Sequence, residues 1–161
     1  MGFFDKLFGG SKNKFKIPEA GGPQPAAQPE GQPKTDNDSR QFANLRDACD
    51  TLLAEYESRG GEFVTFEDIE DDNRWVQAMN DDDETSTLNF SYPFSEEPDR
   101  LIASKGVAFP AGYTLANWES GTFATYFGPR LSISETAAVI DTLFTKLLGS
   151  SPNYSVRGKI E

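Results

Sequence analysis

A proline-rich segment, residues 17–37, limits what the rest of this 161-residue chain can fold into. It holds five prolines, with glycine, glutamine and alanine between them and almost no large apolar side chain. Such a segment buries too little apolar surface to offset the entropy that ordering would cost. We therefore predict a flexible linker here, which separates a short N-terminal segment, residues 1–16, from one folded domain, residues 38–161.

The net charge divides along the same boundaries. Residues 1–16 carry four lysines against one aspartate, a net charge of +3. Residues 38–161 carry 10 basic and 22 acidic side chains, a net charge of −12. Nucleic-acid binding depends on Lys and Arg side chains that neutralise phosphates. The acidic domain therefore argues against nucleic acid as a partner, and electrostatic steering favours a basic or amphipathic protein segment instead.

The chain contains no histidine and a single cysteine, Cys49. These two facts exclude Ser-His and Cys-His nucleophiles, imidazole acid–base chemistry, Cys-based metal sites and an internal disulfide. Phosphate-binding loops and nucleophile elbows are also missing from the sequence. We predict no catalytic residue, no metal and no cofactor, and we expect Cys49 to be a buried structural thiol.

The N-terminal segment has the pattern of a docking element. Its apolar side chains fall on one side of a helical turn or two, and a basic stretch follows Gly9-Gly10. This pattern fits a membrane interface or the groove of a partner protein. Each lysine near an anionic surface contributes only about 1 kcal/mol, so the attachment should be weak. The expected docking residues are Phe3, Phe4, Leu7, Phe8, Lys12, Lys14 and Lys16.

Two alternatives for this segment stay open: a tail with no binding role, and a segment that binds the acidic domain of its own chain. No continuous apolar region leads to a cleavage site, so we do not interpret the segment as a signal peptide. No stretch of the sequence approaches the ~20 apolar residues of a membrane span. We expect a cytoplasmic protein, with peripheral contact at the inner membrane surface where the segment binds lipid.

Two long helices and a short one are predicted in the domain. The first begins near Asp38 or Ser39 and ends at Gly60-Gly61, and the second runs from Leu131 to Leu148 behind a capping box. A short helix or turn is expected within residues 95–105. The apolar stripe of the first helix consists of Phe42, Leu45, Cys49, Leu52, Leu53 and Tyr56, and that of the second of Ile133, Ala137, Ile140, Phe144 and Leu147.

Alternating apolar and polar residues predict the strands. Residues 62–68, 73–80 and 85–94 form an antiparallel meander with acidic connections, and residues 112–120 and 121–128 form a hairpin that turns at Ser120-Gly121. The predicted fold is α+β, with an antiparallel sheet of about five strands flanked by an N-terminal and a C-terminal helix. The order is α-β-β-β-α-β-β-α, and residues 153–161 would add an edge strand.

Acidic residues gather in two clusters, at residues 67–72 and 81–84. Converging carboxylates suit Ca²⁺ or Mg²⁺, but neither cluster has the spacing of an EF-hand loop. Solvated turns that keep a strand-rich domain soluble are the favoured interpretation. The alternative function is an unrecognised enzyme that depends on carboxylates or a divalent metal.

Trp75 and Gln77 fall on one face of the predicted strand 73–80, and Val76 falls on the other. Most aromatic residues of the strand region must belong to the core. On a sheet with one face left open, however, Trp and Tyr side chains make good contact surfaces for a partner.

Three pieces of the sequence resemble the type III secretion chaperone-like fold, and more narrowly the bacterial TY-Chap and YbjN-like sensory-domain families. They are Arg74-Trp75-Val76-Gln77, the run Val107-Ala108-Phe109-Pro110 that leads to Asn117-Trp118, and the closing helix Ala137–Leu148. The resemblance covers residues 39–149. It implies a small acidic domain that binds other proteins, often as a homodimer, without catalysis.

The leading hypothesis from the sequence is a non-catalytic chaperone-like or adaptor domain that binds another protein. The residues that we expect to contact this partner are Trp75, Gln77 and Trp118.

Overall fold

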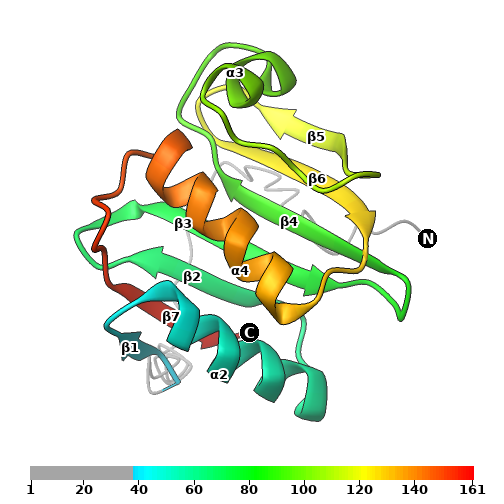
Figure 1. Ribbon diagram of the computed structural model, residues 1–161, viewed down its shortest axis with the longest axis vertical. Helices are drawn as coiled ribbons and strands as arrows, with labels where there is room; N and C mark the ends of the chain where they lie inside the picture. Colours follow the sequence, from blue (N-terminus) through cyan, green and yellow to red (C-terminus); the bar gives the residue numbers. More distant parts are fainter. Residues whose placement is uncertain (1–37) are drawn as a thin grey trace, which may run out of the picture. The chain divides into compact units, whose positions relative to one another are not determined.

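The computed structural model describes residues 38–161, which form a sheet with helices packed against it (Figure 1). The linker and the N-terminal segment predicted for residues 1–37 lie outside the described residues. The elements are β1 (Arg40–Phe42), α2 (Leu45–Arg59), β2 (Val64–Asp68), β3 (Asp71–Asn80), β4 (Thr85–Ser91), α3 (Pro98–Ser104), β5 (Thr114–Glu119), β6 (Phe123–Pro129), α4 (Ile133–Thr142), the π-helix η1 (Leu143–Leu147) and β7 (Val156–Ile160).

All seven strands pair antiparallel in one sheet, in the order β1-β7-β2-β3-β4-β6-β5. The predicted meander is confirmed as β2, β3 and β4, and the predicted hairpin is confirmed as β5 and β6. Gly121 allows the tight turn of that hairpin, because its φ of 75° lies in the left-handed region. The α+β class with an antiparallel sheet is therefore confirmed, whereas the expected number of about five strands is wrong.

The two additional strands, β1 and β7, pair with each other at one side of the sheet. Phe42, expected on the stripe of the first helix, instead lies in β1 opposite Val156. The helix begins later than predicted, after Asn44, whose side chain accepts a hydrogen bond from the Asp47 N–H at 2.9 Å. Phe42 fits both a helical and an alternating pattern, and the long-range pairing with β7 decides between them.

The strand near the C-terminus, β7, was expected at an edge, but it lies inside the sheet between β1 and β2. Helix α2 packs directly over this strand. A Cβ atom at Gly158 would lie only 2.3 Å from Leu52 Cδ1, so the close approach of helix and strand requires glycine here. The edges of the sheet are β1 and β5.

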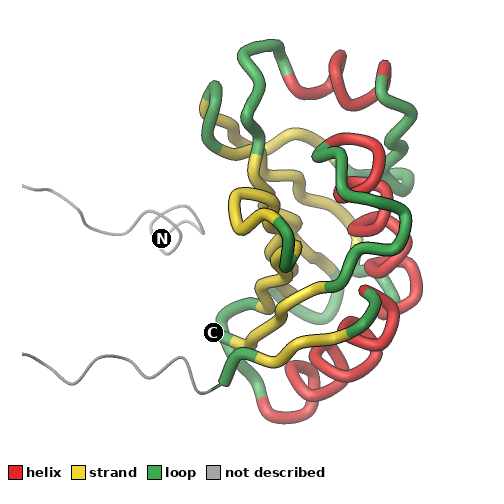
Figure 2. The backbone as a smooth tube through the Cα atoms, turned by 90° about the vertical axis from the view of Figure 1, so that its left-hand side faces the viewer, coloured by secondary structure: helices red, strands yellow, loops and turns green. Residues whose placement is uncertain are grey.

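Helices α2 and α4 cover one face of the sheet and enclose the core (Figure 1). Side chains from the helices and from the inward-facing positions of the strands are fully buried there. Figure 2 shows the helices on one side of the sheet, and no helix of the described part on the other. The core includes Leu52, Phe66, Phe90, Ile140 and Phe144, each 0% exposed.

The second long helix is confirmed, together with its capping box. The Ser132 hydroxyl accepts a hydrogen bond from the Glu135 N–H at 3.2 Å, and the Glu135 carboxylate accepts one from the Ser132 N–H at 2.9 Å. The hydrogen bonds that the Ser132 N–H and the Ser132 hydroxyl donate to the Glu135 carboxylate hold the pKa of Glu135 below its ordinary value. The helix starts at Ile133 rather than Leu131, and its last turn, η1, widens to a π-helix before Gly149.

Stacked aromatic rings cover the part of the same face that lies over β6. The Phe109 ring lies 4.1 Å from the Tyr126 ring, with 11° between their planes. Tyr113 stacks on Phe109 at 5.9 Å, and it occupies the space that a side chain at Gly128 would need. The segment before β5 thus takes the place of a helix in the core.

Candidate binding surface

The face of the sheet turned away from α2 and α4, which we call the open face, is the candidate site (Figure 2). Side chains alternate between the two faces along each strand, and paired residues on neighbouring strands point to the same side. The strand register therefore arranges the side chains of the open face in rows across the sheet. Its middle row consists of Lys159, Thr65, Gln77, Asn89, Thr125 and Asn117, from β7, β2, β3, β4, β6 and β5.

Hydrogen bonds join four side chains of this row, which we call the polar ladder: Thr65, Gln77, Asn89 and Thr125. Gln77 Nε2 donates to Thr65 Oγ1 at 3.4 Å, and Asn89 Nδ2 donates to Gln77 Oε1 at 3.0 Å. Thr125 Oγ1 donates to Asn89 Oδ1 at 2.9 Å. The ladder thus connects β2, β3, β4 and β6 through their side chains as well as their backbones.

Most of the polar ladder is buried, although no described helix lies over it. Asn89 is 7% exposed and Thr125 is 0% exposed, whereas Gln77 is half-buried. Buried polar groups need hydrogen-bond partners, and the ladder supplies them. A carboxamide has two N–H groups, and the bonds of the ladder use one from Gln77. The other N–H has no acceptor among residues 38–161.

Apolar side chains frame the polar ladder on both sides. Trp75 and Phe123 lie in the row on one side, opposite Glu67 and Ser91 respectively. Met79 and Phe127 lie in the row on the other side, where both pair with Thr87. Phe127 is 40% exposed, a large value for a phenylalanine in the middle of a sheet strand. Apolar side chains around a polar centre are typical of contact surfaces.

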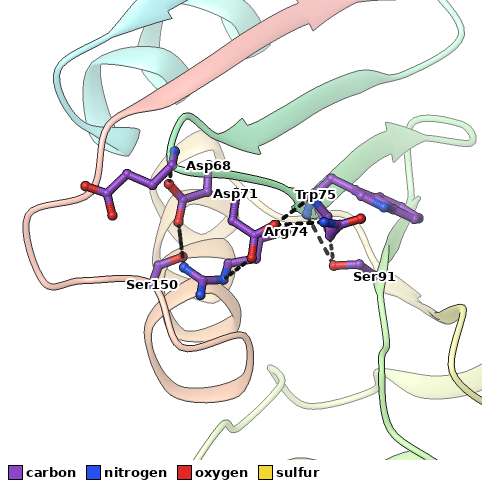
Figure 3. Close-up of polar contacts among 8 residues, drawn as sticks. Asp68, Asp71, Arg74, Trp75, Ser91 and Ser150 are labelled. Atoms are coloured by element: carbon purple, nitrogen blue, oxygen red, sulfur yellow. Dashed lines mark hydrogen bonds and ion pairs between the residues drawn. The ribbon is translucent and has the colours of Figure 1, made fainter.

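The Ser91 hydroxyl fixes the backbone of Trp75 at this face. The Trp75 N–H donates to Ser91 Oγ at 3.2 Å, and Ser91 Oγ donates back to the Trp75 carbonyl at 3.4 Å. These bonds continue the connection between β3 and β4 beyond the pair Val76 and Phe90. Figure 3 shows that Trp75 and Arg74 leave β3 in different directions.

Acidic turns lie at both ends of the open face. The β2–β3 turn carries Asp71, whose pKa is lowered by hydrogen bonds from the side chain and backbone of Asn73. The β3–β4 turn carries Asp82, whose pKa is lowered by the N–H of Glu84 and by hydrogen bonds from Thr85. Both carboxylates therefore remain ionised at neutral pH. Within residues 38–161, no group of three or more acidic or cysteine side chains is placed to hold a metal ion.

One acidic residue of the first cluster, Asp68, is not part of a solvated turn (Figure 3). It is 1% exposed, and its carboxylate accepts hydrogen bonds from Ser150 Oγ at 2.6 Å and from the Glu70 N–H at 3.0 Å. Arg74 Nη1 lies 3.3 Å from the same carboxylate, and Arg74 Nε lies 3.2 Å from Asp71. This network ties the β2–β3 turn to the segment after η1, and the expectation of a solvated side chain was wrong for Asp68.

The structure brings together two of the three residues that we expected to contact a partner. Trp75 and Gln77 lie on the open face, as their spacing predicted. Trp118 pairs with Ala124 on the opposite face of the sheet, where its half-buried ring packs edge-to-face on Tyr92 at 6.0 Å. Trp118 is thus a core side chain and is separated from the other two. The expected docking residues of the N-terminal segment lie outside the described residues.

The rest of the open face was not predicted from the sequence. Asn89, Thr125 and Phe127 were not singled out, although alternation of apolar and polar residues predicted the strand at residues 85–94, in which Leu88 and Phe90 are apolar. That alternation was the available signal, since it places Asn89 on the opposite face from Leu88 and Phe90.

Within the described range, no helix is long and apolar enough to cross a membrane. Comparison of the chain with known proteins yields no matching family model, no matching curated protein and no matching solved structure.

Proposed function

We propose that this chain is a non-catalytic binding protein of the chaperone-like or adaptor kind, which holds a segment of another protein on its open face. The observation that carries the proposal is the polar ladder, framed by Trp75, Met79 and Phe127 on a face that no described helix covers. Aromatic and Met side chains are enriched at protein interfaces. The available N–H of Gln77 adds a polar contact that orients the bound segment.

The breadth of this surface favours a macromolecule over a small ligand. The framed region spans β2, β3, β4 and β6, and it presents one side of a sheet rather than a cavity. Small-molecule sites are concave and bury most of the ligand, whereas protein partners bind over broad surfaces. The resemblance of residues 39–149 to the type III secretion chaperone-like fold belongs to the same proposal, because such domains bind other proteins.

A photo-crosslinking experiment tests this proposal on the full chain. A benzophenone amino acid replaces Met79 on the open face, and the matched control carries it at Ala54, which is exposed on α2. Irradiation in lysate of the producing cells should give a discrete heavier adduct from the Met79 position, and the additional substitution Trp75→Ala should weaken it. Equal adducts from both positions, or none from Met79, would contradict the proposal.

We propose further that the domain acts in the cytoplasm and that residues 1–16 attach it weakly to the inner membrane surface or to a second protein. The support is the net charge of +3 beside the apolar Phe3, Phe4, Leu7 and Phe8. Flotation with anionic vesicles compares the full chain with a variant that lacks residues 1–16. The full chain should float more, with the difference lost in high salt, and equal flotation would exclude the lipid role.

Homodimerisation stays a prediction of the resemblance. Light scattering at two protein concentrations measures it directly, because a dimer has twice the mass of the 17.8 kDa chain.

A further inference from the structure

Strand β3 crosses the open face from one acidic turn to the other. The side chains that it places there are Trp75, Gln77 and Met79, with Asp72 before them and Asp82 after them. Ten residue steps separate Asp72 from Asp82, and eight of them lie within β3, so the two residues are at most about 33 Å apart. The face therefore has a symmetrical pattern: acidic, apolar, polar, apolar, acidic.

The negative charges at the two ends exceed the positive charges beside them. At the β3–β4 turn, Asp83 lies 3.7 Å from Arg130 and is otherwise fully exposed, and Glu84 is also exposed. At the β2–β3 turn, Glu70 and Asp72 are exposed, whereas Asp71 is paired with Arg74. Both ends thus attract positive charge, and the apolar middle of the face does not.

The sheet itself limits how a partner can bind between these ends. Strands β3, β4 and β6 each pair with a strand on either side, so a partner cannot extend the backbone hydrogen bonding here. Contact must be made through side chains. Helices pack on the other face of the same sheet, and a helix on the open face would complete a three-layer arrangement. A helix about 10 Å wide spans three neighbouring strands spaced about 4.8 Å apart, which matches β3, β4 and β6.

We propose that the occupant of the open face is an amphipathic helix of another protein that carries Lys or Arg in both of its end turns. This inference rests on the proposed function and adds the chemistry of the partner. The apolar side of the helix covers Trp75, Met79 and Phe127. A polar residue near the middle of the helix accepts a hydrogen bond from the N–H of Gln77. The basic ends of the helix meet the two acidic turns, which requires at most about 22 residues at 1.5 Å per residue.

Three synthetic peptides of about 22 residues test this arrangement on the full chain by fluorescence anisotropy. All have the same apolar side. The first has lysines in both end turns, the second has the same lysines in its middle turns, and the third has glutamates in both end turns. The first should bind at least about tenfold more tightly than each of the others, and salt should weaken its binding.

Charge reversal in the protein provides the matched control. The pair Asp83→Lys with Glu84→Lys changes one acidic turn, and it should weaken binding of the first peptide about fivefold or more. The pair Asp50→Lys with Glu96→Lys makes the same change of charge outside the open face, and it should leave the affinity within about twofold. Circular dichroism confirms that each variant is folded before binding is measured.

Several outcomes would overturn the inference. Equal binding of the first two peptides would show that the position of the basic residues does not matter. Equal weakening by both charge-reversal pairs would show attraction to the whole acidic domain rather than to the turns. Failure of all three peptides would exclude a helical partner of this kind. None of these results removes the adduct expected at Met79, so the proposed function is tested separately.

Discussion

Removing the centre of the polar ladder tests whether its side chains act as one unit. The single changes are Asn89→Ala and Thr125→Val, and the double variant combines them. Asn89→Ala leaves the Thr125 hydroxyl, which is 0% exposed, without the acceptor that it has at 2.9 Å. Thr125→Val removes the donor to Asn89 Oδ1 instead, and Asn89 is only 7% exposed.

The expected free-energy changes follow from this burial. A buried polar group that loses its partner destabilises a protein by about 1–3 kcal/mol, so each single change should lower the free energy of unfolding by that amount. The double variant removes both the Thr125 hydroxyl and the Asn89 carboxamide, so neither of these two groups stays buried without its partner. Its loss should therefore be smaller than the sum of the single losses by about 1–2 kcal/mol.

Urea unfolding followed by circular dichroism measures this difference. The control combines Asn89→Ala with Thr114→Val, because Thr114 is exposed on β5 and makes no bond to the ladder. In this control, the losses of unfolding free energy from the two single changes should add within about 0.5 kcal/mol. Additive losses for Asn89 and Thr125 would refute the reasoning, since they would show that the ladder bond contributes no coupling.

Three further predictions concern residues elsewhere in the domain. Gly158→Ala should lower the free energy of unfolding in urea by about 1–3 kcal/mol, because its Cβ would lie 2.3 Å from Leu52 Cδ1. Arg74→Ala should lower it by about 1.5–3 kcal/mol, since the buried Asp68 carboxylate loses a charged hydrogen-bond donor. Burial raises the pKa of the Cys49 thiol to about 12, so a thiol reagent at pH 8 should react only as urea unfolds the chain.

Each of these predictions has a clear contrary result. Unchanged stability of the Gly158 variant would mean that α2 can move off β7 without loss of packing. Unchanged stability of the Arg74 variant would mean that Ser150 and the backbone satisfy Asp68 without the cation. Rapid reaction of Cys49 in the absence of urea would contradict its burial.

The central part of the fold could be predicted because its signals are local. Alternation along residues 62–94 fixes which side chains of the meander face inward, and Ser120-Gly121 marks the hairpin turn. The capping box of Ser132 and Glu135 marks the start of α4 within two residues. Each signal is contained in a few neighbouring residues, so tertiary contacts did not alter the secondary structure predicted from them.

The parts that were missed depend on distant partners. Strand β1 has only three residues, and its pairing with β7 cannot be recognised from either segment alone. Asp68 looked like a turn residue because acidic residues surround it in the sequence. Its position two residues after Phe66 puts it on the core side, but burial becomes favourable only because Ser150 and Arg74 reach it from elsewhere.

The candidate surface was predictable to the same extent. Trp75 and Gln77 were placed correctly because alternation within one strand decides their side. Trp118 was expected to join them, but no local pattern relates the faces of two strands that β4 and β6 separate. Only the pairing of those strands shows that Trp118 faces the core and that Asn89 and Thr125 join Gln77.

The position of β7 has a consequence for how this domain is made. A ribosome completes β7 about 90 residues after β2, and at about 5–20 residues per second this delay is roughly 5–18 s. During that time β2 is an open edge, and Leu52 on α2 has no strand beneath it. The growing chain is thus most prone to aggregation at its earliest elements. Insertion of β7 between β1 and β2 ends this exposure in a single step.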